Sequence, residues 1–359
     1  MVMAAAAAAA TRKRPAPGGT DGATARSKRA RITLGSIDDY ETMEVLGEGS
    51  FGVVVKARHR VTGEAVAIKR ASKASSGHLR AVLREAGCLA ACRGHPSVVA
   101  LRDVVEDAST GDVFLVMEFV AGATLRRLLL LQQQQQRSPS YSSPARFTEA
   151  EVRSVMRQLL RGAERMHSAG IIHRDIKPDN ILVSVSGAGG VAVKICDLGL
   201  AVPARAEYPE RRVGTLRYRS PEQLAGRRDY GAGVDIWALG CVMAELLAAG
   251  ELLFGGADTE DAVLAMAMEL GRALDDKGMK AFDEWPAFQG LPEAELSPEA
   301  REVLAGLLAV EPRDRLTATA ALKHRWFAED EDECPPAATC RSMVRAARSS
   351  SASVVTVVV

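Results

Sequence analysis

The stretch His173-Arg174-Asp175-Ile176-Lys177-Pro178-Asp179-Asn180 gathers reactive side chains into one short loop that follows a long predicted helix. Asp175 is a candidate general base, and Lys177 is a cation that can neutralise phosphate. Asn180 offers an oxygen to Mg²⁺, which binds oxygen donors in proteins. A base, a cation and an oxygen ligand at this spacing favour phosphate chemistry over a purely structural turn.

A glycine-rich stretch, Gly47-Glu48-Gly49-Ser50-Phe51-Gly52-Val53-Val54, lies between two strand-like runs. Glycines let the backbone approach phosphates closely and leave its N–H groups free to donate. A Rossmann site would continue into a helix, whereas strand residues follow here. A nucleotide-binding hairpin and a glycine-rich hairpin without a ligand both remain compatible with this stretch alone.

The run Val66-Ala67-Ile68-Lys69 alternates as a strand, so Ala67 and Lys69 share one face. A small residue beside a lysine suits an adenine roof with a phosphate contact; the alternative is a surface lysine. Glu85 lies beside the apolar stripe of the following predicted helix. This acid is either solvated, as is usual, or turned inward to pair with Lys69.

Hydrophobic periodicity predicts a β-rich front part and a helical remainder. Strands are expected at residues 44–46, 53–57, 65–69, 98–105 and 113–119, and helices at 79–89, 148–166, 234–249, 258–270 and 299–308. Thr148 and Glu151 are spaced as a capping box at the start of a helix.

Together these motifs resemble those of the protein kinases. The family's order continues with Asp197-Leu198-Gly199, Ser220-Pro221-Glu222, Asp235-x-Trp237-x-x-Gly240 and Arg315. The resemblance covers about residues 40–327 and rests on motifs that chance would not place in this order.

The resemblance implies an α+β fold with two lobes. The small β-rich N-lobe would span residues 40–120 and the larger helical C-lobe residues 121–327. It also implies ATP and Mg²⁺ as cofactors. The substrates would be proteins, with no role for nucleic acid or membrane.

The family's residue roles carry over to matching positions. Asp175 would accept the proton of the substrate hydroxyl, and Lys177 would steady the transferring phosphoryl group. Lys69, paired with Glu85, would hold the α- and β-phosphates. Asn180 and Asp197 would hold Mg²⁺. The ATP-binding residues implied in this way are Leu46, Gly47, Glu48, Gly49, Ser50, Phe51, Gly52, Val53, Val54, Ala67, Lys69, Met117, Glu118, Val120 and Leu182.

Ile176-Lys177-Pro178 is the serine/threonine type of catalytic loop, and the chain resembles the cyclin-dependent kinases within that class. Of the family's cyclin-binding helix motif P-S-T-A-I-R-E, only Arg84-Glu85 is present. A cyclin partner is therefore left open. Other cell-cycle kinases or the RNA polymerase II C-terminal domain are the expected substrates, and a plant-type kinase-activating kinase is a plausible relative. The alternative is a catalytically silent scaffold with a kinase fold.

Regulation is expected to differ from that of typical cyclin-dependent kinases. Glu210 occupies the position of the activating threonine, where it would face Arg84 and Arg174. Its carboxylate carries less charge than a phosphate, so it would replace one only in part. Gly214 and Arg219 match the family's proline pocket, which implies substrates with proline after the phosphorylated residue.

The two ends of the chain are of low complexity. Residues 1–36 are expected to form a disordered basic arm whose clusters within 12–31 act as a nuclear import signal, with a cytoplasmic pool as the alternative. The chain has a net charge of +1, so a basic arm leaves a slightly acidic remainder. A low-complexity insert is predicted at 132–146, and a disordered acidic, then Ser-rich, tail at 328–359. The cysteines are expected to be buried and reduced rather than zinc ligands.

Overall fold

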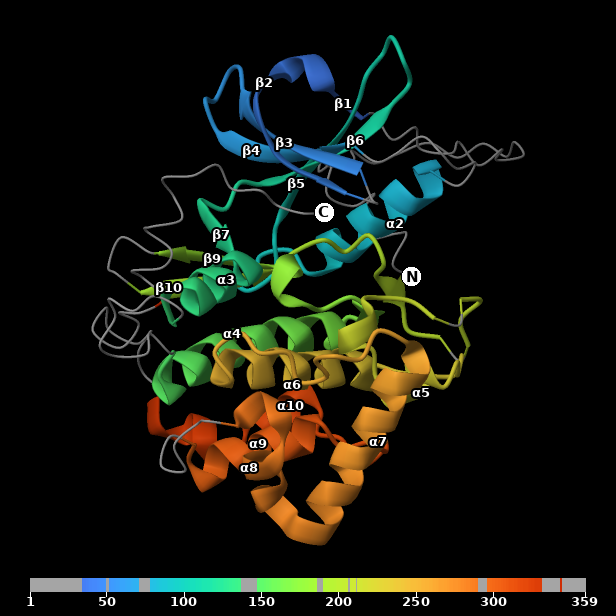
Figure 1. Cartoon of the computed structure of the whole chain (residues 1–359). Helices are drawn as coiled ribbons and strands as arrows, with labels where there is room; N and C mark the ends of the chain where they lie inside the picture. The colour runs from blue at the N-terminus through green and yellow to red at the C-terminus, as the bar shows by residue number, and fades with distance from the viewer. Residues whose placement is uncertain are drawn as a thin grey trace, which may run out of the picture.

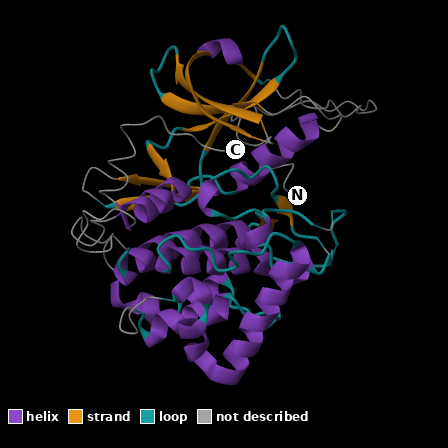
Figure 2. Cartoon of the chain, in the orientation of Figure 1, coloured by secondary structure: helices purple, strands orange, loops and turns teal. Residues whose placement is uncertain are grey.

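The computed structural model describes residues 34–49, 52–70, 78–136, 147–185, 190–205, 207–210, 212–289, 296–330 and 343. A β-rich lobe with one long helix lies against a larger lobe built mainly of helices (Figures 1 and 2). This is the two-lobed architecture that the sequence predicts.

The N-lobe is built on a six-stranded sheet with the order β1-β5-β6-β4-β3-β2. Its strands are β1 Gly35–Ser36, β2 Tyr40–Gly49, β3 Gly52–His59, β4 Ala65–Arg70, β5 Leu101–Glu106 and β6 Val113–Glu118. Helix α2 (His78–Ala91) packs on β5 and β6. All pairs are antiparallel except β1 with β5.

Side chains of β4 alternate between two faces, as its sequence predicts. Val66 and Ile68 are buried in an apolar cluster with residues from neighbouring strands. Ala67 and Lys69 lie on the opposite face, where they line a pocket. The period of two therefore sorts core from site within this one strand.

The helical lobe packs around α4 (Glu149–Ser168) and α6 (Gly233–Leu247). Its other α-helices are α3 Leu125–Gln136, α5 Pro221–Leu224, α7 Glu260–Lys277, α8 Ala281–Glu284, α9 Pro298–Leu307 and α10 Ala318–Leu322. Its short strands are β7 Gly122–Thr124, β8 Ile171–Ile172, β9 Ile181–Val185, β10 Val191–Ile195 and β11 Val202–Pro203. Short 3-10 helices occur at Ile37–Asp39, Pro178–Asn180, Leu216–Tyr218, Gly278–Lys280, Pro286–Phe288 and Arg325–Asp330.

The predicted capping box fixes the start of α4. The Thr148 backbone N–H donates to Glu151 Oε2 at 2.8 Å, and the Glu151 N–H donates to Thr148 Oγ1 at 3.2 Å. These two bonds satisfy N–H groups that would otherwise lack partners at a helix start. The three-residue spacing of Thr148 and Glu151 in the sequence was therefore sufficient to locate the start of this helix.

Helix α6 is apolar almost throughout but contains Glu245, which is fully buried. Its carboxylate accepts hydrogen bonds from the Tyr218 hydroxyl (2.7 Å) and from the Arg126 guanidinium. Burial raises the pKa of Glu245, and Arg126 opposes that rise. A buried acid is tolerated here because its oxygens have partners.

Three sequence expectations need correction. Residues 132–136 of the insert predicted at 132–146 form the end of α3, because glutamine is a good helix former and Gln132 lies on the buried side. The strand predicted from Val98 begins at Leu101, since the backbone of residues 97–99 bonds to Ile195 of β10 instead.

The third correction concerns the predicted disordered ends. Gly35 and Ser36 pair with β5, and the tail residue Met343 is buried with its N–H donating to Glu151 Oε1 at 3.2 Å. Residues 1–33 of the basic arm and most of the tail lie outside the described residues, as do residues 137–146.

Candidate active site

A mainly apolar pocket lies between the sheet and the helical lobe. Its lining residues come from β2, β3, β4, α2, the segment before β5, the end of β6 with the segment after it, and β9 with the residues that follow β10; they are Leu46, Val54, Ala67, Lys69, Glu85, Val99, Met117, Glu118, Phe119, Val120, Leu182, Cys196 and Asp197. Eight of the residues predicted to bind ATP are among them. A flat, apolar slot with few polar groups suits a purine ring.

Other predicted ATP residues stand elsewhere. Gly47, Glu48, Gly49, Gly52 and Val53 belong to the β2–β3 hairpin and are not among the described residues that line the pocket. Ser50 and Phe51 lie outside the described residues.

Sequence reasoning missed Val99 and Cys196 as pocket residues. Val99 reaches the pocket because its N–H donates to the carbonyl of Ile195 at 2.9 Å, which ties the two lobes together. Cys196 directly precedes Asp197, and that adjacency was the only signal in the sequence.

The Glu118 carboxylate does not point freely into the pocket. It pairs with Lys194 at 2.8 Å and accepts the Ala100 N–H at 2.9 Å. These bonds hold the segment that leads from the sheet into the helical lobe, which leaves the backbone of this segment to meet a ligand.

Lys69 joins the two lobes through a pair of carboxylates. Its ammonium donates to Glu85 Oε1 at 2.9 Å and to Asp197 Oδ1 at 2.6 Å. Glu85 is thus turned inward, which settles the alternative of a solvated acid. Burial alone lowers the pKa of Lys69, but the two carboxylates outweigh it and the pKa is raised. The ammonium therefore stays charged, and Lys69 lines the pocket.

Asp175 and the residues around it form a compact polar cluster. Asp175 Oδ1 accepts the Thr215 N–H at 2.8 Å, and Lys177 Nζ lies 3.0 Å from Asp175 Oδ2. Lys177 also donates to Thr215 Oγ1 at 2.9 Å. Asn180 Nδ2 donates to the Asp175 carbonyl at 2.9 Å. The structure brings together the three catalytic-loop residues that the sequence predicts.

Buried Asp235 supports this loop from below. Its two carboxylate oxygens accept the backbone N–H groups of His173 and Arg174, each at 2.9 Å, and one also bonds His167 Nε2. Arg174 has a φ of 70°, a left-handed conformation that costs a non-glycine residue energy. Burial raises the pKa of Asp235, but His167 outweighs it and the pKa is lowered. An ionised Asp235 thus holds a strained turn.

The oxygen atoms available for a divalent cation come from Asn180 and Asp197. Because Asn180 donates through Nδ2, its Oδ1 stays available, and Asp197 Oδ2 accepts no hydrogen bond from the residues described. Lys69 lowers the pKa of Asp197 against the effect of burial, so the carboxylate is charged. One amide and one carboxylate oxygen beside a phosphate site fit Mg²⁺, which completes its shell with phosphate and water.

Glu210 lies where the sequence predicts it, facing Arg174. Its Oε2 is 3.2 Å from Arg174 Nη1. Burial raises the pKa of Glu210, but the hydrogen bond from its own backbone N–H and the charge of Arg174 outweigh burial, so the pKa is lowered. Arg84 donates instead to the Gly199 carbonyl at 2.9 Å and acts on Glu210 only through its charge.

Two tyrosines complete the surroundings of Arg174 and were not predicted. The Tyr230 hydroxyl accepts from Arg174 Nη1 at 3.2 Å, and the guanidinium lies 5.5 Å from the Tyr208 ring centroid. Tyr208 and Tyr230 stack on each other at 4.7 Å. Aromatic contacts thus supplement the single carboxylate in holding this arginine.

Gly214 and Arg219 form one hydrogen-bonded unit. Gly214 has a φ of 92°, and a β-carbon there would stand 2.3 Å from the Arg174 carbonyl, so only glycine fits this backbone. Arg219 Nε donates to the Gly214 carbonyl at 2.8 Å, and its Nη1 donates to Glu260 at 2.6 Å. Glu260 also pairs with Arg212.

Comparison with known proteins agrees with this geometry. The family model described as "Protein kinase domain" matches residues 40–327. A rice chain (Oryza sativa subsp. japonica) named cyclin-dependent kinase F-2 is 41% identical over 84% of this chain and 93% of its own length. "Cell division control protein 2 homolog 3" of Trypanosoma brucei brucei is 34% identical over 81% of this chain and 93% of its own length. "Cyclin-dependent kinase 11.1" of Caenorhabditis elegans is 33% identical over 84% of this chain but 42% of its own length.

The similarity extends over nearly all of the described chain. It agrees with the two-lobed fold and with the Lys69–Glu85–Asp197 cluster beside the catalytic loop. The chain belongs to the eukaryotic serine/threonine protein kinases and resembles the cyclin-dependent kinases.

Proposed function

We propose that this chain is an active, ATP- and Mg²⁺-dependent kinase that phosphorylates serine or threonine in proteins. The observation that carries the proposal is the closed Lys69–Glu85 pair, at 2.9 Å, with Asp197 on the same ammonium. A silent scaffold would not need this buried charge cluster, which is costly unless each member is paired. The catalytic loop is assembled beside it.

The residues divide the work of phosphoryl transfer between them. The apolar pocket would hold the adenine, and Lys69 would bind phosphate oxygens. Asn180 and Asp197 would hold Mg²⁺, which supplies charge neutralisation at the phosphates. Asp175 would orient the substrate hydroxyl and take its proton, and Lys177 would stabilise charge on the transferring group.

We further propose that substrates carry proline after the phosphorylated residue. Arg219 already donates to the Gly214 carbonyl at 2.8 Å, so a substrate N–H would have to compete with the guanidinium for this oxygen. Proline has no N–H and loses nothing there. Other cyclin-dependent kinases and the RNA polymerase II C-terminal domain are the substrates to be tried first.

We also propose that basal activity does not require a cyclin. Glu85 reaches Lys69 in the single chain, and the carboxylate of Glu210 engages Arg174 where the family uses a phosphate. Assays with and without candidate cyclins test this point. An absolute requirement for a cyclin would contradict it.

The central test is transfer of labelled phosphate from ATP to proline-containing serine and threonine peptides. The Asp175→Asn variant should lose transfer while it still binds a fluorescent ATP analogue. Asp179→Asn is the matched control, because Asp179 lies in the same loop but pairs with Arg126 at 3.3 Å. Absence of transfer by the wild type, or near-normal turnover by Asp175→Asn, would refute the proposal.

A further inference from the structure

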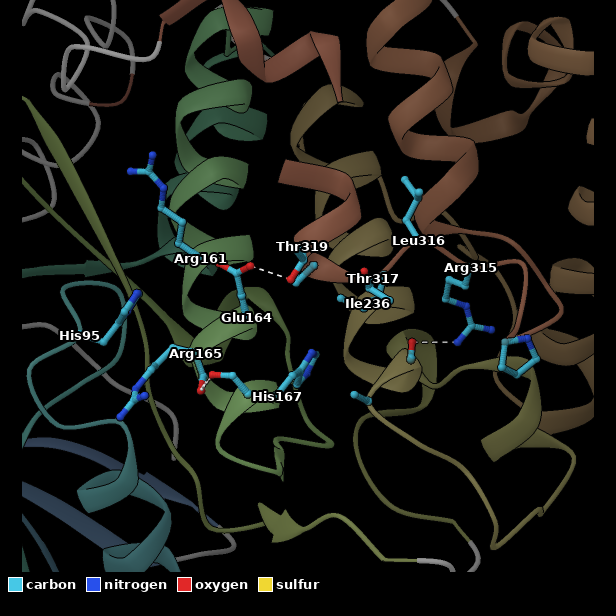
Figure 3. A pocket seen from close by; sticks show the side chains of 15 residues that line it. His95, Arg161, Glu164, Arg165, His167, Ile236, Arg315, Leu316, Thr317 and Thr319 are labelled. Carbon is cyan, nitrogen blue, oxygen red and sulfur yellow. Dashed lines mark hydrogen bonds between the residues drawn. The ribbon is translucent and has the colours of Figure 1, made fainter. Parts of the chain in front are cut away.

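A second concave region lies on the helical lobe, away from the ATP pocket. It has a volume of about 560 Å³ and lies between α4, the start of α6, and α10 with the loop before it, and it extends to His95 in the loop between α2 and β5. Figure 3 shows His95, Arg161 and Arg165 on one side and Arg315, Leu316 and Thr317 on the other. We refer to this region as the α4 groove and to the first three residues as its basic end.

The basic end carries positive charge that the protein does not neutralise. Arg161 and Arg165 are exposed. Among the residues described, Arg161 has no hydrogen bond or ion pair, and Arg165 donates only to the Ala91 carbonyl. The pKa of His95 is lowered by burial and then by Arg165, Lys194 and Arg161, which together outweigh the opposing charge of Glu164, so the histidine is neutral.

The one carboxylate among the residues that line the groove is Glu164, and it is engaged. Its Oε1 accepts the Thr319 hydroxyl at 2.6 Å, a bond drawn as a dashed line in Figure 3. A nucleic acid backbone would pass its phosphates close to this carboxylate. The charge pattern therefore favours a ligand with anionic groups at one end only.

The other end of the groove is apolar and electrically balanced. Half-buried Leu316 contributes apolar surface, and Ile236 and Ala318, which are almost fully buried, lie beneath it in the lining. Arg315 lines this end, but its guanidinium is bound to both oxygens of Glu222, at 2.8 and 3.0 Å. This end therefore offers an apolar contact rather than a second anion site.

The α4 side of the groove is long enough for about three residues of extended chain. Its α4 residues run from Arg161 to Ser168, and a helix rises about 1.5 Å per residue, which gives roughly 10 Å. An extended peptide rises about 3.3 Å per residue, so three residues span that length. We propose that the α4 groove binds an extended segment of a partner protein that places carboxylates against Arg161 and Arg165 and an apolar side chain against Leu316.

A ligand in the α4 groove would contact a residue that supports the catalytic loop. His167 lines the groove, and its Nε2 bonds Asp235, which holds the backbone of His173 and Arg174. His167 therefore connects the groove to Asp235 through one hydrogen bond. The binding proposal does not depend on catalysis, so it can be tested even if the proposed function fails.

The test uses the full chain and a fluorescein-labelled nine-residue peptide with three consecutive glutamates followed by leucine. The peptide contains no serine, threonine or tyrosine, so it is not a substrate. Fluorescence anisotropy should show saturable binding that weakens as salt is added. The double variant Arg161→Glu/Arg165→Glu should raise the Kd of the peptide at least about tenfold, which corresponds to about 1.4 kcal/mol of binding free energy.

Controls separate the groove from general charge attraction. Arg58→Glu/Arg80→Glu makes the same charge change at exposed N-lobe positions and should leave binding within about twofold. Arg161→Ala/Arg165→Ala gives a milder second variant, and thermal melting checks that each variant is folded. Peptides with glutamine for glutamate, or glycine for leucine, should each bind several-fold more weakly.

Several results would overturn the proposal. One is the absence of saturable binding by the wild type. The others are a loss of affinity in Arg58→Glu/Arg80→Glu equal to that in Arg161→Glu/Arg165→Glu, or an altered peptide that binds as tightly as the original one. Binding that appears only after Glu329, Glu331 and Glu333 are changed to glutamine would show that the chain's own acidic run takes the place of a partner. That result would also overturn the proposal of a partner segment.

Discussion

Removal of the Arg219 guanidinium should abolish the preference for proline after the phosphorylated residue. In the wild type, Arg219 Nε occupies the Gly214 carbonyl at 2.8 Å. A substrate with alanine at this position would therefore bury an N–H without an acceptor, at a cost of about 1–3 kcal/mol. This converts to a ratio of roughly 5- to 150-fold in kcat/KM between proline and alanine peptides.

In Arg219→Met the carbonyl of Gly214 becomes free to accept the alanine N–H, so the ratio should fall toward unity. Glu260→Gln should give an intermediate ratio, because Glu260 orients the Arg219 guanidinium through a bond of 2.6 Å. Arg217→Met is the matched control. Arg217 lies two residues away and bonds the Phe254 carbonyl and the exposed Asp258, so its loss should leave the ratio unchanged.

The assay compares kcat/KM for three peptides that differ only at this position: proline, alanine and N-methylalanine. N-methylalanine lacks both the ring and the N–H, so it separates a hydrogen-bond effect from a fit of the ring. The wild type should treat it like proline. If it is as poor a substrate as alanine, or if Arg219→Met keeps the wild-type ratio, the reasoning from the Gly214 carbonyl is wrong.

Three further predictions follow from the site and the chain ends. Glu210→Ala should lower the activity of unphosphorylated enzyme roughly two- to fivefold, since a half-exposed ion pair contributes up to about 1 kcal/mol; equal activities, with both proteins shown unphosphorylated by mass spectrometry, would exclude a phosphate-like role. Asp235 has a folded pKa below its unfolded value, so it stabilises the protein above about pH 4 and this contribution is lost as pH falls through the folded pKa. Between pH 6 and pH 3, the free energy of unfolding in urea should therefore fall less for Asp235→Asn than for the wild type. Equal falls would contradict a lowered pKa for Asp235. A fluorescent fusion of the chain without residues 1–36 should be less nuclear than the fusion of the full chain, and an unchanged distribution would refute the predicted import signal.

The sequence by itself determined the features that depend on neighbouring residues. The capping box needs only Thr148 and Glu151, and the alternation of β4 needs only Ala67 and Lys69 to share a face. The loop with Asp175, Lys177 and Asn180 keeps its residues together because eight residues cannot separate them far. Local geometry constrains each of these, so pattern and spacing were enough.

Only the tertiary structure decided which distant groups meet. The sequence left the direction of Glu85 open, because its contact with Lys69 depends on how α2 packs on the sheet. The ring contacts of Tyr208 with Arg174 and the bonds of Asp235 to the catalytic loop join segments about 30 to 60 residues apart. Burial shifts the pKa values of such groups, and it follows from the packing of the whole chain rather than from any local pattern. The same packing leaves Arg161 exposed beside a groove.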